Sequence, residues 1–231
     1  MKIGLLQSDN LPDEVRAKHG DYTEIFGRWL AEPAFDFERH LVIDDLFPER
    51  PDQCDAWLIT GSPSGAYDDH DWIRRLEDFV RSVHAAGTPM VGICFGHQIM
   101  AQALGGKVEK SSGGWSIGVA SYAIEGVGDS IPLIAMHQDH VVVPPPSASL
   151  VGSSSSCRYA ALRYGDRGLS IQPHPEFTNE FLADLLDVVG DRLPASIVAA
   201  AAASLDQPTS ADRVATYVKD FLKRAVALNA R

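Results

Sequence analysis

Short apolar runs alternate with longer amphipathic stretches over the first half of the chain. The runs that have the length and composition of buried strands cover residues 2–7, 40–43, 56–60 and 90–93. Apolar positions recur at helical spacing over residues 22–30 and 72–86. Strands that alternate with helices form a mostly parallel sheet flanked by helices, with the chemistry at the carboxyl ends of the strands. We therefore predict an α/β fold.

The pattern changes over residues 118–172, where strand-like segments become short and turns become frequent. Residues 120–124, 141–143 and 160–164 have strand-like composition. Strands joined by turns rather than by helices pair in antiparallel fashion. We expect these strands to be antiparallel additions, which makes the complete sheet mixed.

The C-terminal part of the sequence contains three predicted helices. They cover residues 177–189, residues 195–205 and a segment that begins near Ser210. The last helix has one apolar stripe, formed by Val214, Tyr217, Val218, Phe221, Leu222 and Ala225. We favour packing of this stripe on the same domain, and the alternative is a docking surface for another subunit or a second copy. We accordingly predict a main domain over residues 1–190 and a C-terminal helical extension over residues 191–231.

Length and charge restrict the function classes. With 231 residues, 45% of them hydrophobic, the chain suffices for one sizeable domain and a small helical addition. Its 31 acidic residues exceed the 20 basic ones, which gives a formal net charge of -11, and no basic block could follow a phosphate backbone. No apolar run reaches membrane-spanning length. We expect a cytoplasmic protein that binds neither nucleic acid nor membranes.

The three cysteines are Cys54, Cys94 and Cys157, widely spaced along the chain. They form neither a Cys-x-x-Cys pair nor a disulfide framework. A reducing cytoplasm suits such a chain, because it keeps a catalytic thiol reduced.

Cys94 occupies a sharp turn between a predicted strand and a helix predicted over residues 95–104. Glycines at positions 92 and 96 would let the strand and the helix approach closely and hold the cysteine at a strained turn, which is the geometry of a nucleophile elbow. The start of the helix would favour the attacking thiolate. A lone cysteine in an apolar segment is usually just a small buried hydrophobic residue, so a second signal is needed.

That second signal is the stretch Pro173-His174-Pro175-Glu176. Side chains two residues apart in an extended segment point to the same face, which places His174 beside Glu176. The two prolines exclude the middle of a helix or of a central strand. A cysteine nucleophile needs a base that takes and returns its proton, and the base needs a partner that orients it. Cys94, His174 and Glu176 are therefore the predicted catalytic residues.

Together the two motifs resemble the signature of the class I glutamine amidotransferases, a Gly-x-Cys-x-Gly-x-Gln elbow followed later by His-Pro-Glu. The resemblance covers roughly residues 1–190 and implies the flavodoxin-like fold of that family. It implies hydrolysis of the side-chain amide of glutamine through a cysteine thioester, with no cofactor and no metal. The loop at residues 61–65, followed by residues 66–69, is most similar to the stand-alone, GMP synthase-like members and the related γ-glutamyl peptidases.

The resemblance implies roles for five further residues. The backbone amides of Phe95 and Ser62 would stabilise the oxyanion of the tetrahedral intermediate. Gln98 lies one helical turn beyond the cysteine and would help to hold the substrate, together with Gly61. Trp115 is expected to line the glutamine site.

Two positions depart from the family pattern. Ser62 stands where glycine is usual, and Pro173 stands where an aromatic residue commonly precedes the histidine. A residue before proline, as Ser62 is before Pro63, is confined to extended angles. If the oxyanion hole required a conformation open only to glycine, Ser62 could not serve.

Two other stretches have alternative interpretations. Residues 111–116 resemble a pyrophosphate-binding Ser-Gly-Gly-x-Asp-Ser loop, but the aspartate is missing, so we interpret them as a turn that enters a β-ribbon. His137, Asp139 and His140 have side chains that could coordinate a metal. The amidotransferases carry a similar segment near the active-site face and need no metal, and we expect a loop that contacts the acceptor or a partner.

Three functions remain open from the sequence. The first is a glutamine-hydrolysing amidotransferase that passes ammonia to a separate synthetase or works alone. The second is a γ-glutamyl peptidase, which would use the same thioester chemistry on γ-glutamyl peptides or conjugates. The third is a non-catalytic regulatory subunit, and the intact catalytic residues count against it. The partners would be glutamine or a γ-glutamyl substrate and, for the first function, a synthetase subunit or a second copy of the chain.

Overall fold

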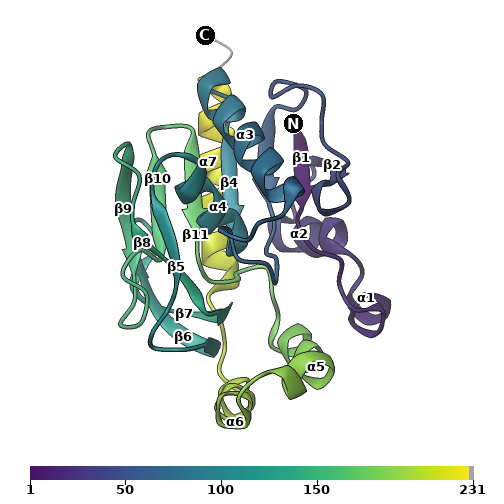
Figure 1. Cartoon of the computed structure of the whole chain (residues 1–231), viewed down its shortest axis with the longest axis vertical. Coiled ribbons are helices and arrows are strands. Elements are labelled where there is room, and N and C mark those ends of the chain that lie inside the picture. The colour runs from purple at the N-terminus through teal and green to yellow at the C-terminus, as the bar shows by residue number, and fades with distance from the viewer. Residues whose placement is uncertain (229–231) are drawn as a thin grey trace.

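The computed structural model describes residues 1–228 and contains a nine-stranded central sheet and a two-stranded ribbon (Figure 1). The strands are β1 Lys2–Gln7, β2 Asp36–Leu41, β3 Ala56–Ile59, β4 Met90–Ile93, β5 Lys107–Lys110, β6 Ser116–Ile124, β7 Gly128–His137, β8 Asp139–Val143, β9 Ala148–Ser153, β10 Ala161–Tyr164 and β11 Gly168–Ile171. The helices are α1 Asp13–His19, α2 Tyr22–Leu30, α3 Asp71–Ala86, α4 Phe95–Ala103, α5 Asn179–Val189, α6 Ala195–Ser204 and α7 Ala211–Ala227, with short 3-10 turns η1 Val42–Asp44 and η2 Gly190–Arg192.

Five strands form the parallel part of the sheet, in the order β2-β1-β3-β4-β11. Their carboxyl ends lie together at the lower edge of the sheet in Figure 1. Successive side chains alternate between two cores: Ile3 and Leu5 pack on one face, and Leu6 packs on the other. Apolar residues on both faces are typical of parallel strands that helices cover on both sides. The prediction of a mostly parallel sheet flanked by helices is confirmed.

The two faces are covered by different helices. On one face, α3 and α4 pack on the strands through residues such as Leu76 and Ile99. On the other face, α2, α5 and α7 pack through residues such as Phe26, Leu182 and Phe221. The predicted bounds of α2 agree with the structure, and α3 begins one residue earlier than predicted.

The remaining four strands of the central sheet extend it in antiparallel fashion, from β11 through β10, β9 and β6 to β7. The predicted mixed sheet is therefore confirmed, although β7 and β9 were not predicted. The ribbon of β5 and β8 is also antiparallel. Three of the four β5 residues are exposed, which explains its polar sequence. The predicted turn follows it, and there the Gly114 amide donates to the Ser111 carbonyl oxygen at 3.2 Å.

Two elements near the N-terminus differ from the prediction. The strand predicted at residues 40–43 is β2, which ends at Leu41, and η1 occupies the positions that follow. This strand lies at the edge of the sheet, where polar residues are tolerated, so its sequence lacks a continuous apolar run. Helix α1 was not predicted, because Val15 is its one buried residue.

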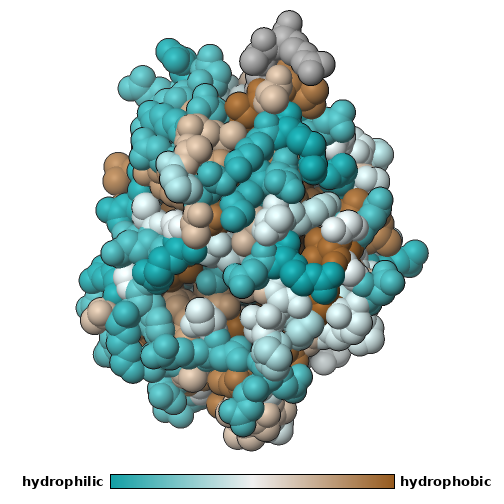
Figure 2. All heavy atoms as spheres, turned by 180° about the vertical axis from the view of Figure 1, so that it is seen from behind, coloured by the Kyte–Doolittle hydropathy of each residue, from teal (hydrophilic) through white to brown (hydrophobic). Residues whose placement is uncertain are grey.

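Helix α7 buries its predicted apolar stripe within the chain itself. Val214, Val218 and Phe221 belong to the core on that face of the sheet, and Tyr217 packs against it. The stripe therefore does not form a docking surface. Figure 2 shows the face opposite to that of Figure 1, where hydrophilic residues predominate and apolar residues form smaller patches. The domain boundary at residue 190 stays a prediction. Within residues 1–228, no helix combines the length and the apolar character that crossing a bilayer requires.

Candidate active site

Cys94 lies where β4 ends and α4 begins, at the carboxyl end of the parallel sheet. Its backbone has φ 53° and ψ -103°, which are strained for a residue with a side chain. The flanking glycines permit the close packing: a Cβ on Gly92 would lie 2.4 Å from the Gly96 oxygen, and one on Gly96 would lie 2.4 Å from the Ile59 oxygen. The turn therefore has the geometry of a nucleophile elbow.

His174 follows β11, the strand that pairs with β4 on the side away from β3. Its Nδ1 atom lies 2.7 Å from Glu176 Oε1, and both side chains are buried. Its ring stacks on Phe177 with 4.1 Å between centroids and 4° between planes. Its backbone amide donates to the Ile134 oxygen at 2.7 Å. Side-chain and backbone contacts together fix the position of the ring.

Gly61 lies between His174 and Cys94. A Cβ at Gly61 would lie 2.9 Å from His174 Cε1 and 3.8 Å from Cys94 Cβ, so glycine is the residue that leaves room for the imidazole. Burial lowers the pKa of His174, but the neighbouring Cys94 thiolate and Glu176 carboxylate outweigh burial and raise this pKa to about 10. A protonated imidazole beside the sulfur favours a thiolate–imidazolium pair.

Two backbone amides near the sulfur have no hydrogen-bond partner in the part of the chain that the structure describes. One belongs to Phe95, the first residue of α4, where an amide has no acceptor within its own helix. The other belongs to Ser62, which lines the same cavity as Cys94. Ser62 does not have a positive φ, so a serine fits this position without strain. Both amides are available to a substrate oxygen.

Two glutamine side chains join the cysteine to the ribbon. Gln98 Nε2 donates to the Asp139 carbonyl oxygen at 3.0 Å and to Gln172 Oε1 at 3.3 Å. Gln172 Nε2 in turn lies 3.6 Å from Cys94 Sγ, within the distance of a hydrogen bond to sulfur. This chain of contacts fixes the position of the sulfur relative to β8.

A cavity of about 460 Å³ opens in front of Cys94 and His174. Residues on and around the β5–β8 ribbon line one end, which we call the ribbon end: Tyr67, Lys110, Trp115, Gln138 and Asp139. Residues on and around α1, α2 and α5 line the other, which we call the helical end: Asp9, Asn10, Tyr22, Phe177, Leu185, Val189, Arg192 and Leu193. In Figure 1 the ribbon and these helices lie on opposite sides of the lower edge of the sheet.

The family model described as "Glutamine amidotransferase class-I" matches residues 38–183. The chain belongs to the class I glutamine amidotransferase family. Gamma-glutamyl peptidase 3 of Arabidopsis thaliana is 32% identical to it, over 90% of this chain and 91% of the relative. A GMP synthase [glutamine-hydrolyzing] of Clostridium botulinum is 28% identical, over 68% of this chain and 31% of the synthase.

Solved structures support the same amidotransferase fold. The crystal structure of a glutamine amido transferase from Methylobacillus flagellatus superposes with a TM-score of 0.73, over 97% of this chain and 94% of that one, at 21% identity. A glutamine amidotransferase from Thermotoga maritima superposes with a TM-score of 0.72 over 98% of this chain and 96% of that one, at 18% identity. These likenesses establish the fold of this amidotransferase family member over nearly its whole length.

The structure brings most of the predicted site residues together around one cavity. The predicted residues that line the cavity are Cys94, His174, Gly61, Ser62, Gln98 and Trp115. Phe95 follows the cysteine as the first residue of α4. Glu176 contacts Nδ1 of the histidine. His97 does not line this cavity: its Nδ1 lies 2.7 Å from Ser170 Oγ, and burial lowers its pKa to about 3. Its position is structural.

Three residues of the site were not assigned a role from the sequence. Gln172 lies two residues before His174, so the alternation that places His174 and Glu176 on one face of the segment also places Gln172 there. Its contact with the sulfur could have been predicted from that alternation. Asp9 follows β1, and the carboxyl end of a parallel strand was its signal. Tyr22 gave no signal. Its hydroxyl donates to Asp9 Oδ2 at 3.2 Å, and burial raises the pKa of Asp9 to about 6.

The segment predicted as a loop that contacts the acceptor or a partner forms the corner between β7 and β8, and the contact itself stays a prediction. β7 ends at His137, and β8 begins at Asp139, whose backbone oxygen accepts from Gln98. Burial lowers the pKa of His137 to about 3, so the ring is neutral at pH 7. The corner forms part of the cavity wall.

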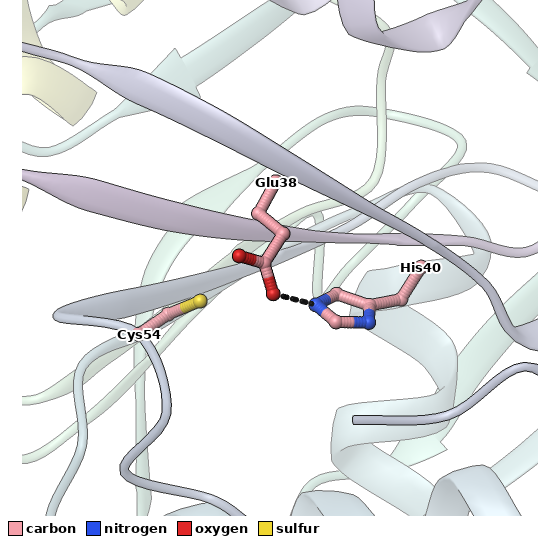
Figure 3. A group of neighbouring side chains, drawn as sticks. All are labelled: Glu38, His40 and Cys54. Carbon is pink, nitrogen blue, oxygen red and sulfur yellow. Dashed lines mark ion pairs between the residues drawn. The ribbon is translucent and has the colours of Figure 1, made fainter. Parts of the chain in front are cut away.

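A second group of a cysteine, a histidine and a glutamate lies at β2, an outermost strand of the central sheet. This edge cluster consists of Glu38 and His40 on β2 and Cys54 before β3 (Figure 3). Their possible ligand atoms lie within 4.8 Å of one another. However, Glu38 Oε1 contacts His40 Nε2 at 3.0 Å and accepts from Gln53 at 2.8 Å, while Oε2 pairs with Lys2. Because protein groups already contact both carboxylate oxygens, the cluster fits an ion-pair network better than a metal centre.

Proposed function

We propose that this chain hydrolyses the γ-amide bond of a glutamyl substrate through a thioester on Cys94. The observation that carries the proposal is the cysteine at a strained turn, beside a buried His174–Glu176 pair and facing a cavity. The proposed chemistry uses no cofactor and no metal ion. A reducing compartment such as the cytoplasm would keep the thiol active.

In the first half-reaction, the Cys94 thiolate attacks the γ-carbonyl carbon, and the carbonyl oxygen becomes an oxyanion. The amides of Phe95 and Ser62 would donate to this oxygen. When the intermediate collapses, the C–N bond breaks and the His174 imidazolium gives its proton to the departing nitrogen. The products are a glutamyl thioester and the free amine, which is ammonia when glutamine is the substrate.

In the second half-reaction, neutral His174 takes a proton from a water molecule that attacks the thioester carbon. The C–S bond breaks, which releases glutamate and restores the Cys94 thiolate with the imidazolium. Glu176 holds Nδ1 of the ring at 2.7 Å and stabilises the positive charge without taking the proton itself.

The glutamyl part of the substrate would lie at the ribbon end of the cavity. Gln98 and Trp115 line the wall there, and Gly61 lets the substrate approach both reacting side chains. Lys110 brings a positive charge to this end, which suits the α-carboxylate of a glutamyl group. The ribbon therefore orients the substrate, and the parallel strands supply the reacting groups.

With glutamine as substrate, we propose a GMP synthase-like role in which ammonia passes to a separate synthetase subunit. The partner in this role would be that subunit or a second copy of the chain. The likeness to a GMP synthase supports this role. A second candidate is a γ-glutamyl peptidase. The similarity to gamma-glutamyl peptidase 3 and a cavity that continues past Cys94 into a separate helical end favour it.

Both candidates are tested by measuring glutamate release from glutamine and from a γ-glutamyl dipeptide by the parent chain. Cys94→Ala should lower both rates by about 10⁴-fold or more, because it removes the nucleophile. Cys54→Ala is the matched control and should keep the parental rates, since Cys54 lies outside the cavity. Parental activity in Cys94→Ala would refute the proposal, and a folded parent that cleaves neither substrate would favour the regulatory subunit. The ratio of the two kcat/KM values decides between amidotransferase and peptidase.

A further inference from the structure

The position of His174 determines which end of the cavity receives the leaving group. In the proposed reaction this residue protonates the departing nitrogen, so that nitrogen must leave on the side of the imidazole. The ring stacks on Phe177, and Phe177 packs on Phe181 of α5 with 4.1 Å between centroids. The leaving group therefore faces the helical end, while the glutamyl group lies at the ribbon end.

The helical end has more lining residues than an ammonia molecule can contact. Ammonia is similar in size to a water molecule, which occupies about 30 Å³ in the liquid. Eight residues line the helical end, among them residues of α2, α5 and η2. A leaving group that fills this end is an amine with a substituent, such as an amino acid.

The walls of the helical end combine an apolar surface with one cation. Leu185, Val189 and Leu193 are partly exposed and line the cavity. Arg192, between the last two, is exposed and makes no ion pair or hydrogen bond with any residue in the range 1–228. A free guanidinium beside aliphatic side chains suits a carboxylate attached to an apolar group.

The cationic side chains of the cavity lie at its two ends. Apart from histidines, Lys110 and Arg192 are the basic residues that line the cavity within the described chain, the first at the ribbon end and the second at the helical end. Glutamine has one carboxylate, at the end remote from the amide. A γ-glutamyl amino acid has two, one on each side of the scissile bond, and this arrangement matches the two cations.

We propose that the helical end is a leaving-group site for γ-glutamyl peptides whose released amino acid has an apolar side chain and a free carboxylate, and that Arg192 binds this carboxylate. The inference rests on the proposed γ-glutamyl hydrolysis. Arg192 contacts the leaving group and none of the reacting atoms, so it contributes to specificity. The Asp9 carboxyl at the same end disfavours a second negative charge beside it, which directs the substrate carboxylate toward the arginine.

The experiment compares γ-glutamyl-leucine, γ-glutamyl-leucinamide and glutamine as substrates. The leucinamide has the same apolar group without the carboxylate. The parent should prefer γ-glutamyl-leucine to the leucinamide by about tenfold in kcat/KM, the effect of one charged hydrogen-bonded contact. Arg192→Gln should remove this preference by raising KM for γ-glutamyl-leucine alone, with kcat unchanged. Arg192→Lys should restore part of it.

Arg50→Gln is the matched control, because Arg50 is exposed, pairs with Asp52 and lies outside the cavity. It should leave all three kcat/KM values unchanged. Equal losses on all three substrates in Arg192→Gln, or no loss on γ-glutamyl-leucine, would overturn the role of Arg192. A parent that hydrolyses glutamine but not γ-glutamyl-leucine would overturn the leaving-group site and leave the proposed hydrolysis standing. A parent that hydrolyses none of the three would overturn both.

Discussion

The proposed catalytic group and the edge cluster contain the same three residue types, yet their electrostatics are opposite. The catalytic group raises the pKa of His174 to about 10, whereas burial lowers the pKa of His40 in the edge cluster. The carboxylates differ as well. Glu176 is buried against the histidine, while Glu38 is partly exposed and also pairs with Lys2. The histidine of the edge cluster therefore shares its carboxylate with a competing cation.

The sulfur atoms complete the contrast. Cys94 is held at a positive φ at the start of a helix, where it faces a cavity. Cys54 precedes β3, and burial raises its pKa to about 11, so its thiol stays protonated at neutral pH. The comparison teaches that residue types alone do not make a nucleophile. A nucleophilic cysteine also needs the backbone turn that exposes its sulfur and a histidine whose partners keep it charged.

The largest difference between the two groups should come from their histidines. His174→Gln should lower hydrolysis of glutamine or a γ-glutamyl dipeptide by about 10⁴-fold, because it removes the proposed base beside the sulfur. His40→Gln should keep the parental rate. Steady-state kinetics on both variants measures this, with circular dichroism as the control for folding. Equal rates for the two variants would end the assignment of His174 as the base.

The carboxylates should differ less. Glu176→Gln should reduce kcat by about 10²- to 10³-fold, since the amide neither fixes the ring tautomer nor stabilises the imidazolium. Glu38→Gln should leave kcat unchanged, because its carboxylate lies outside the cavity. If Glu176→Gln has the parental kcat, Glu176 has no part in the mechanism.

The smallest expected difference concerns thiol reactivity as a function of pH. The raised pKa of His174 means that the imidazolium persists above pH 6.5, and its charge is lost only as pH rises toward 10. Alkylation of Cys94 should therefore stay fast at pH 6.5 in the parent. In His174→Gln the alkylation rate should fall by about 100-fold, because only about one in a hundred ordinary thiols is ionised at that pH.

Mass spectrometry of the alkylated peptides measures both rates, and it provides an internal control. Cys54 should react slowly at pH 6.5 in the parent and in the variant, because its thiol is buried and protonated. Faster labelling of Cys54 than of Cys94 would reverse the comparison between the two groups.

The signals from which the sequence predicted the proposed reacting groups are local. The glycines around Cys94 and the alternation from His174 to Glu176 act within a few residues, where chain geometry is decisive. Asp9 and Tyr22 reach the site because α1 and α2 pack beside the sheet. Such packing between distant segments leaves no local signal in a single sequence. β7 was missed for a related reason. It includes Pro132 and exposed polar positions that do not mark a continuous strand.

One backbone contact described above has a mechanical consequence. The His174 amide donates to Ile134 on β7, an edge strand whose strand partner in the central sheet is β6. The β6–β7 hairpin therefore contacts both proposed reacting residues, because the Met136 carbonyl oxygen on the same strand lies 3.9 Å from Cys94 Sγ. Met136 and His137 of the same hairpin line the cavity, so substitutions at its other positions that shift β7 should change the distance between base and nucleophile, which makes those positions targets for engineering the rate.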